Sequence, residues 1–222
     1  MAHLELTAAD GHRLAAYRAD PAGAARGAVV VVQEIFGVNS HIRSICDRLA
    51  EAGYVAIAPA IFDRYERDFE TGYSPAEIER AKALMPGFQM DACLLDIEAA
   101  RAQVAGAGKV GIVGFCLGGS VAYAVAARLP GFAAASSFYG GMVARLADQP
   151  PMCPVQFHFG ADDASIPPEN YNAVQAKRPE AEFHVYENAG HGFNCDQRGS
   201  YAPGPAALAW QRTLDFLART LG

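Results

Sequence analysis

The stretch with the clearest chemical potential is Gly-Phe-Cys-Leu-Gly, residues 114–118. It follows a short apolar run and precedes a helical stretch, Ser120 to Arg128. A nucleophilic residue between two glycines at this spacing is typical of a nucleophile elbow, here with cysteine in place of serine. The turn from strand to helix is so tight that a Cβ on Gly114 or Gly118 would crowd the nucleophile. The motif therefore predicts Cys116 as a nucleophile.

The position of Cys116 at the start of a helix also predicts its chemistry. The positive end of the helix favours a thiolate there, and the backbone N–H of Leu117 would point to a developing oxyanion. A structural interpretation stays open, in which Cys116 is a buried cysteine before a glycine-rich helix start.

Two further polar residues follow predicted strands later in the chain. Asp163 comes after the strand Pro154–Phe159, and His191 comes after the strand Glu182–Tyr186. The order Cys116, Asp163, His191 matches the nucleophile, acid, histidine order of α/β-hydrolases. His191 would act as general base and then as general acid, while the carboxylate orients its ring. Asp162 is the rival to Asp163.

Glu34 is a less obvious candidate. It follows the valine-rich run 28–32, which is predicted to be a buried strand beside the central one. A carboxylate there is costly unless it is paired, so Glu34 is a candidate partner of the Cys116 thiol. The alternative is a solvated loop carboxylate. The N–H of Ile35 is the candidate second oxyanion donor, since it follows that strand.

The hydrophobic pattern predicts the elements that position these residues. Strands alternate with helices along nearly the whole chain, after an N-terminal hairpin around Asp10-Gly11. This alternation predicts an α/β fold with a mostly parallel, doubly wound sheet flanked by helices. Because sites in such sheets form at the carboxyl ends of strands, the candidate residues should gather there. The absence of a linker or repeat predicts a single domain, residues 1–222.

Composition excludes several classes of function. The chain has 222 residues, 51% of them hydrophobic, and a net charge of −6, which argues against disorder and against a nucleic-acid binder. Its five cysteines are scattered, which is typical of neither a disulfide framework nor a zinc site and fits the cytoplasm. Cys195 follows His191 by four residues, yet no further ligands converge, so no metal is predicted. Neither a signal peptide nor a membrane span is predicted.

Three motifs together resemble the dienelactone hydrolase family (carboxymethylenebutenolidases). They are Gln-Glu-Ile-Phe-Gly at 33–37, Gly-Phe-Cys-Leu-Gly-Gly at 114–119 and Gly-His-Gly-Phe at 190–193. The resemblance implies the α/β-hydrolase fold and a Cys-His-Asp hydrolase of a carboxylated cyclic enol-lactone. The ring would open to maleylacetate in the degradation of catechols, chiefly chlorinated ones. The resemblance also implies that Cys116 rests as a neutral thiol bonded to Glu34. It further implies a monomer without metal or organic cofactor.

The resemblance also implies substrate-binding residues. The family binds the substrate carboxylate with two arginines, and Arg64 matches the first of them. A bidentate guanidinium suits that task, although Arg64 lies in a charged stretch where a solvated role is the alternative. The second arginine aligns with Cys195. Arg198 is a candidate replacement, or a surface salt-bridge residue.

Aromatic residues near the strand ends are candidate walls of the substrate pocket. Phe36, Tyr139 and Phe193 flank the predicted site in sequence, and a place in the core is the alternative for each.

Several functions remain in competition. The leading one is a lactone or ester hydrolase that acts through a cysteinyl acyl-enzyme on a small molecule. A carboxylesterase or thioesterase of broader specificity is the second, because Cys195 departs from the family pattern. A redox-sensing or binding protein on the same fold is the non-enzyme alternative. A glutamine amidotransferase is disfavoured, because its acid normally stands two residues after the histidine, where this chain has Phe193.

Overall fold

The computed structural model describes residues 2–222. The chain forms two compact units, with the boundary between Gly111 and Ile112. The interpretation of residues 1–222 as one domain stays a prediction.

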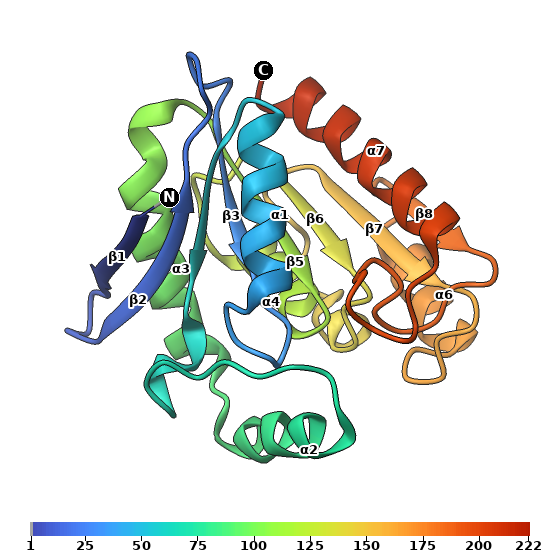
Figure 1. Cartoon of the computed structure of the whole chain (residues 1–222). Helices are drawn as coiled ribbons and strands as arrows, with labels where there is room; N and C mark the ends of the chain where they lie inside the picture. The colour runs from blue at the N-terminus through green and yellow to red at the C-terminus, as the bar shows by residue number, and fades with distance from the viewer. Residues whose placement is uncertain (1) are drawn as a thin grey trace. The chain divides into compact units, whose positions relative to one another are not determined.

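The first unit begins with the predicted hairpin and continues with alternating strands and helices (Figure 1). Its strands are β1 (Ala2–Thr7), β2 (Arg13–Ala19), β3 (Ala28–Val32) and β4 (Val55–Pro59). Its helices are α1 (Ser40–Glu51), η1 (Ile61–Arg64), α2 (Pro75–Leu84), η2 (Met85–Gly87), α3 (Met90–Val104) and η3 (Ala105–Ala107). The strand order is β1-β2-β4-β3, in which β3 and β4 are parallel and the other pairs are antiparallel.

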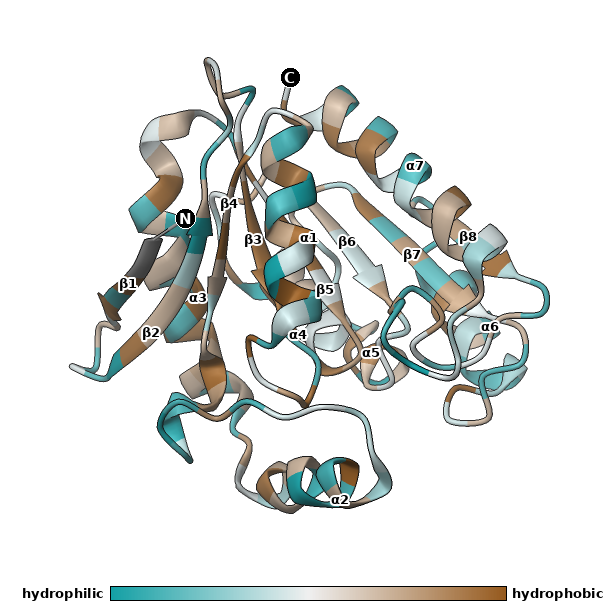
Figure 2. Ribbon diagram, in the orientation of Figure 1, coloured by the Kyte–Doolittle hydropathy of each residue, from teal (hydrophilic) through white to brown (hydrophobic). Residues whose placement is uncertain are grey.

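The core of this unit follows from its sequence. All five residues of β3 are fully buried, as expected for a parallel strand covered on both faces, and Figure 2 shows this strand in the brown of hydrophobic residues. Both α1 and α3 pack against β3 and β4. The side chain of Asn39 accepts a hydrogen bond from the Ile42 N–H and caps the start of α1. Ser74 and Glu77 form a capping box at the start of α2.

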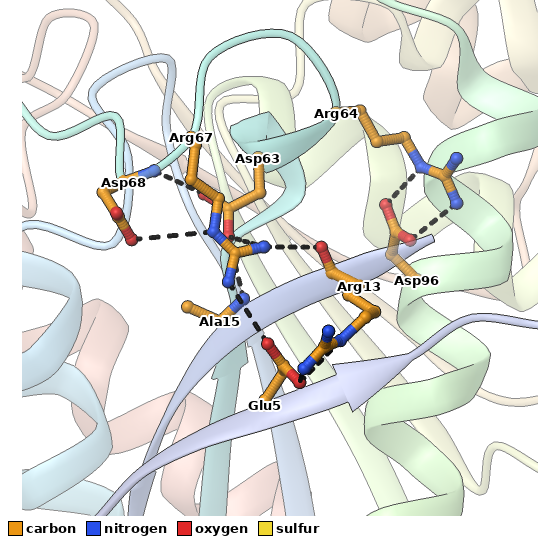
Figure 3. Close-up of polar contacts among 8 residues, drawn as sticks. All are labelled: Glu5, Arg13, Ala15, Asp63, Arg64, Arg67, Asp68 and Asp96. Carbon is orange, nitrogen blue, oxygen red and sulfur yellow. Dashed lines mark hydrogen bonds and ion pairs between the residues drawn. The ribbon is translucent and has the colours of Figure 1, made fainter. Parts of the chain in front are cut away.

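The irregular stretch before α2 is held by a buried carboxylate. Asp63 accepts hydrogen bonds from the backbone N–H groups of Ala15 (2.8 Å) and Asp68 (2.9 Å). Figure 3 shows Asp63 between these partners and the guanidinium of Arg67. One aspartate therefore ties β2 to the charged loop that follows β4.

The second unit contains the rest of the alternating pattern. The strand β5 (Val110–Phe115) runs across the boundary into it, and the later strands are β6 (Ala134–Phe138), β7 (Val155–Gly160) and β8 (Glu182–Tyr186). Its helices are α4 (Leu117–Arg128), α5 (Val143–Leu146), α6 (Pro168–Lys177) and α7 (Pro203–Thr220). The order is β5-β6-β7-β8, and both β6–β7 and β7–β8 are parallel.

Close backbone approaches shape this unit. A Cβ on Gly119 of α4 would overlap the carbonyl oxygen of Phe138, at the end of β6. Glycine therefore allows α4 to pack directly on β6. The C-terminal helix α7 contacts β6 and β7 (Figure 1).

The structure confirms the α/β class with mostly parallel strands, and it corrects one helix start. The elbow helix begins at Leu117, earlier than the predicted Ser120, because the chain turns into it directly after the nucleophile. The last helix begins at Pro203, since proline suits a first helical turn where no N–H partner is needed. Among residues 2–222, no helix combines the length and apolar character needed to cross a bilayer.

Candidate active site

The turn at Cys116 has the geometry that the motif predicts. Cys116 lies between β5 and α4 with φ 55° and ψ −112°, a left-handed conformation that is strained for a residue with a side chain. A Cβ on Gly114 would overlap the carbonyl oxygen of Gly118. Glycine is therefore required at position 114 by the close approach of the strand end to the first turn of the helix.

Within the second unit, His191 lies between a thiol and a carboxylate. Its Nε2 is 3.1 Å from the Sγ of Cys116, and its Nδ1 is 2.7 Å from Oδ2 of Asp163. The structure also separates the two acidic candidates. Asp163 is 3% exposed and its Oδ1 accepts a hydrogen bond from the Ser165 N–H, whereas Asp162 is exposed. Asp163 is thus the carboxylate that orients the ring.

The electrostatics of this trio favour a protonated imidazole. Burial acts most strongly on the pKa of His191 and lowers it. When Cys116 is ionised, its charge and the hydrogen bonds to Asp163 and Cys116 outweigh burial, and together they raise this pKa to about 10. A charged ring that faces a sulfur at 3.1 Å is suited to hold and then deliver a proton.

The start of α4 offers a donor for an oxyanion. Cys116 is the N-cap residue, and its side chain makes no capping hydrogen bond. The backbone N–H groups of a helix's first turn have no acceptor within the helix. The Leu117 N–H is therefore suited to a negative oxygen beside Sγ.

The end of β6 contacts the backbone of the elbow. The carbonyl of Phe138 accepts a hydrogen bond of 3.0 Å from the Cys116 N–H. Tyr139, which is fully buried with φ 37°, places its ring 5.2 Å from the His191 ring. Phe193 packs edge-on against Tyr139 at 5.5 Å. Both predicted pocket aromatics of this unit are buried against the site.

Glu34 lies in the first unit, just beyond the end of β3. Its side chain is 1% exposed, and the phenol of Tyr73 makes a long contact of 3.5 Å with its Oε2. Tyr73 also accepts a hydrogen bond of 3.0 Å from Asn39 and packs edge-on against Phe36 at 4.8 Å. Ile35 follows Glu34 in the same turn. The alternative of a solvated Glu34 is wrong.

Tyr73 is a polar residue that the sequence analysis missed. It stands in an irregular stretch far from Glu34 along the chain, so neither periodicity nor a motif identifies it.

Comparison with known proteins identifies the chain's relatives. The model of the dienelactone hydrolase family matches residues 14–221. The chain belongs to the dienelactone hydrolase family. A carboxymethylenebutenolidase of Pseudomonas putida is 37% identical over 94% of this chain and 92% of its own. A Synechocystis protein provisionally given the same name is 39% identical over 90% of this chain and 89% of its own.

The fold agrees with this membership. A crystal structure from Klebsiella pneumoniae, provisionally assigned as a dienelactone hydrolase, superposes with a TM-score of 0.85 and 34% identity. The match covers 99% of this chain and 100% of that one. The predicted family is therefore confirmed, and the chain is a lactone or ester hydrolase.

Within this family member, Arg64 has a different environment from the one predicted. Its guanidinium makes two parallel contacts of 2.7 Å with Asp96, as Figure 3 shows, and further contacts of 2.8 and 3.2 Å with Asp10. The Asp96 side chain is 0% exposed and that of Arg64 is 12% exposed. Two carboxylates thus already occupy the fork that was predicted to bind a substrate carboxylate. The solvated alternative is wrong, and the geometry indicates a structural ion pair. A role of Arg64 in binding a substrate carboxylate stays a prediction.

Arg198 lies close to the histidine loop. Its guanidinium covers Gly192, where a Cβ would overlap Nη1 of Arg198. Cys195, at the position predicted to correspond to the family's second arginine, is fully buried. A role of Arg198 in binding substrate stays a prediction.

Proposed function

We propose that this protein is a cysteine-dependent hydrolase that opens a small lactone or ester through an acyl-enzyme on Cys116. One observation carries the proposal: His191 contacts Sγ of Cys116 at 3.1 Å and Oδ2 of Asp163 at 2.7 Å. A nucleophile, a proton carrier and an orienting carboxylate are the components that acyl transfer needs.

The reaction then runs in two stages. The sulfur of Cys116 attacks the ester carbonyl, and the new oxyanion accepts a hydrogen bond from the Leu117 N–H. The C–O bond breaks, and His191 gives its proton to the leaving oxygen. In the second stage His191 takes a proton from water, which attacks the thioester and frees the acid and the thiolate. Asp163 keeps the ring oriented throughout.

Two further roles in this proposal come from the resemblance to the family. Glu34 would take the thiol proton of Cys116 when substrate binds, and the Ile35 N–H would be the second oxyanion donor. Glu34→Gln keeps the shape of the side chain and removes its basicity. We expect it to lower kcat with little change in KM; an unchanged kcat would remove Glu34 from the mechanism.

The substrate proposed first is the carboxylated enol-lactone of the family, with its place in catechol degradation. The enol is a good leaving group, which suits a thiolate nucleophile. A neutral ester or thioester is the second candidate, and one observation favours it: the Arg64 guanidinium is already paired with Asp96 and Asp10.

The test measures loss of a dienelactone and hydrolysis of a neutral nitrophenyl ester, with the wild type and Cys116→Ala. Loss of both activities in the variant, together with a mass increase equal to one acyl group in the quenched wild type, is the expected result. Turnover of only the neutral ester would select the broader esterase. Full activity of Cys116→Ala would contradict the proposed mechanism.

A further inference from the structure

A buried polar cluster packs against the end of β6 and has no part in the mechanism above. At its centre is His158 on β7, which is 0% exposed. Its Nε2 lies 2.8 Å from Oε1 of Gln156 and 3.2 Å from Oγ1 of Thr213, and its Nδ1 lies 2.8 Å from the Tyr186 hydroxyl. Both ring nitrogens therefore have partners in the core.

The orientation of the Gln156 amide determines what it offers to the ring. Its Nε2 donates to Oε2 of Glu182 at 3.0 Å and to the carbonyl of Arg212 at 3.2 Å. The oxygen Oε1 is therefore the atom that faces His158, and a carbonyl oxygen can only accept. Nε2 of His158 must carry a proton.

The other two partners agree with that tautomer. The Thr213 hydroxyl donates to the carbonyl of Ala209 at 2.9 Å, so its oxygen is free to accept from His158. With the proton on Nε2, Nδ1 is an acceptor for the Tyr186 hydroxyl. Every hydrogen bond around the ring is satisfied by a single neutral tautomer.

The surroundings also keep the ring neutral. Burial, followed by electrostatic interactions with His184 and Arg212, lowers the pKa of His158 well below its ordinary value. Glu182, the carboxylate of this cluster, is engaged by Gln156 and by Arg219. A neutral ring with fixed hydrogen bonds is a rigid part of the core.

His158 contacts Phe138, the last residue of β6, through its ring, and it contacts the next residue, Tyr139, through its backbone. It stacks on Phe138 with a centroid distance of 4.2 Å and an interplanar angle of 20°, and the His158 carbonyl accepts a hydrogen bond of 2.8 Å from the Tyr139 N–H. The Phe138 carbonyl in turn accepts from the Cys116 N–H at 3.0 Å. The path from His158 to the nucleophile thus contains one aromatic stack and one hydrogen bond.

Cys116, where this path ends, and Tyr139, which follows Phe138, both have strained backbones. Cys116 and Tyr139 have φ values of 55° and 37°, and neither is glycine. Such conformations persist only where neighbouring contacts hold them. The hydrogen bond from Cys116 to the end of β6 affects the placement of the sulfur. A misplacement of about 1 Å can reduce a rate about a hundredfold.

We propose that His158 is a positioning residue for the reaction: its neutral imidazole, with the proton on Nε2, holds Phe138, whose carbonyl accepts from the Cys116 N–H, so that the strained Cys116 faces His191. This inference rests on the proposed function for its kinetic readout. Its direct readouts, the tautomer of His158 and the reactivity of Cys116, do not depend on any substrate.

The first experiment replaces His158 with Phe, which keeps an aromatic ring for the stack and removes both nitrogens. We expect kcat to fall about tenfold, with KM within about twofold. Val174→Ala is the matched control, since Val174 is a fully buried residue of α6 outside this cluster. An equal loss of kcat in the two variants at similar Tm, or an unchanged kcat in His158→Phe, would reduce His158 to a packing residue.

Milder variants keep the inference testable if His158→Phe does not fold. Tyr186→Phe and Thr213→Val each remove one hydrogen bond to the ring and keep the shape of the side chain. We expect each to slow alkylation of Cys116 by iodoacetamide at neutral pH. Wild-type alkylation rates in both variants would overturn the proposal.

The alkylation assay reports on Cys116 with little interference. Cys46, Cys93 and Cys195 are buried, and burial raises the pKa of Cys153 to about 11. Cys116→Ala gives the background rate. If the wild type hydrolyses neither test substrate, this assay still measures the placement of the thiol, so failure of the proposed function is distinguishable from failure of the positioning role.

Nitrogen NMR of protein labelled at histidine tests the tautomer directly. We expect His158 to keep its proton on Nε2 and to show no titration between about pH 5 and pH 9. A proton on Nδ1, or a titration in that range, would contradict the inferred network.

Discussion

At the scale of single residues, the charge of His191 decides the pH range of the reaction. Its pKa is raised from the ordinary 6.5 to about 10, so the ring holds its proton below that pH and loses it above. The imidazolium contributes stability that is fully present below about pH 6.5 and is lost as the pH rises through 10. In the proposed mechanism the same proton is given to the leaving oxygen, so activity should disappear in the same alkaline range.

We therefore predict that kcat/KM falls on the alkaline side with a midpoint near pH 10. Asp163→Asn removes the charged acceptor at Nδ1, so the midpoint should move to lower pH and kcat/KM should fall by at least about a hundredfold. A pH profile from about 7 to 11 measures both effects. Asp162→Asn, at the exposed neighbour, is the matched control and should behave as the wild type.

At the scale of elements, the junction of β5 and α4 depends on glycine at position 114, which has no Cβ. Gly114→Ala would place a Cβ onto the Gly118 carbonyl, and the backbone of the elbow would have to move. We predict a loss of about 3 kcal/mol in the free energy of unfolding, measured by urea denaturation. Gly204→Ala in the first turn of α7, where a Cβ meets no atom within 4 Å, should be neutral or slightly stabilising. Equal effects of the two substitutions would contradict this account of the elbow.

Arg64 joins three elements of the first unit: the β1–β2 turn through Asp10, η1, and α3 through Asp96. Arg64→Leu would leave the buried Asp96 without its partner. Burial already raises the pKa of that carboxyl, so its charge would then be costly. We predict a loss of about 3 to 5 kcal/mol in unfolding free energy, with much of it recovered in the double variant Arg64→Leu/Asp96→Leu. The exposed Asp10 adds little.

Kinetics with the same single variant separate the two roles of Arg64. A structural ion pair predicts that KM for a carboxylated lactone stays within about twofold of the wild type in the protein that folds. A large rise in KM for that substrate, with no change for a neutral ester, would restore Arg64 as the anchor of the substrate carboxylate.

At the scale of the whole molecule, the net charge of −6 acts on any charged substrate. A negative protein repels an anionic lactone over distances that salt screens, while a neutral ester is unaffected. We predict that raising the ionic strength increases kcat/KM for the carboxylated lactone by less than about tenfold and leaves that for a neutral nitrophenyl ester unchanged. A decrease for the anionic substrate would instead indicate a positively charged binding site.

The sequence by itself determined the chemistry-bearing positions and the order of the elements. The elbow at Cys116, the later acid and histidine, and the strand ends before them are visible because each depends on local spacing: glycines two residues either side of a nucleophile, and apolar runs that end in polar residues. The resemblance that these motifs carry was confirmed as family membership.

Only the tertiary structure decided which side chains face one another. It selected Asp163 over Asp162 by burial, paired Arg64 with Asp96 across 32 residues of sequence, and brought Tyr73 to Glu34 across 39. It also placed His158 against Phe138. The physical reason is common to these cases: a hydrogen bond or ion pair depends on distances and angles between groups far apart in the chain, and local periodicity contains no information about them.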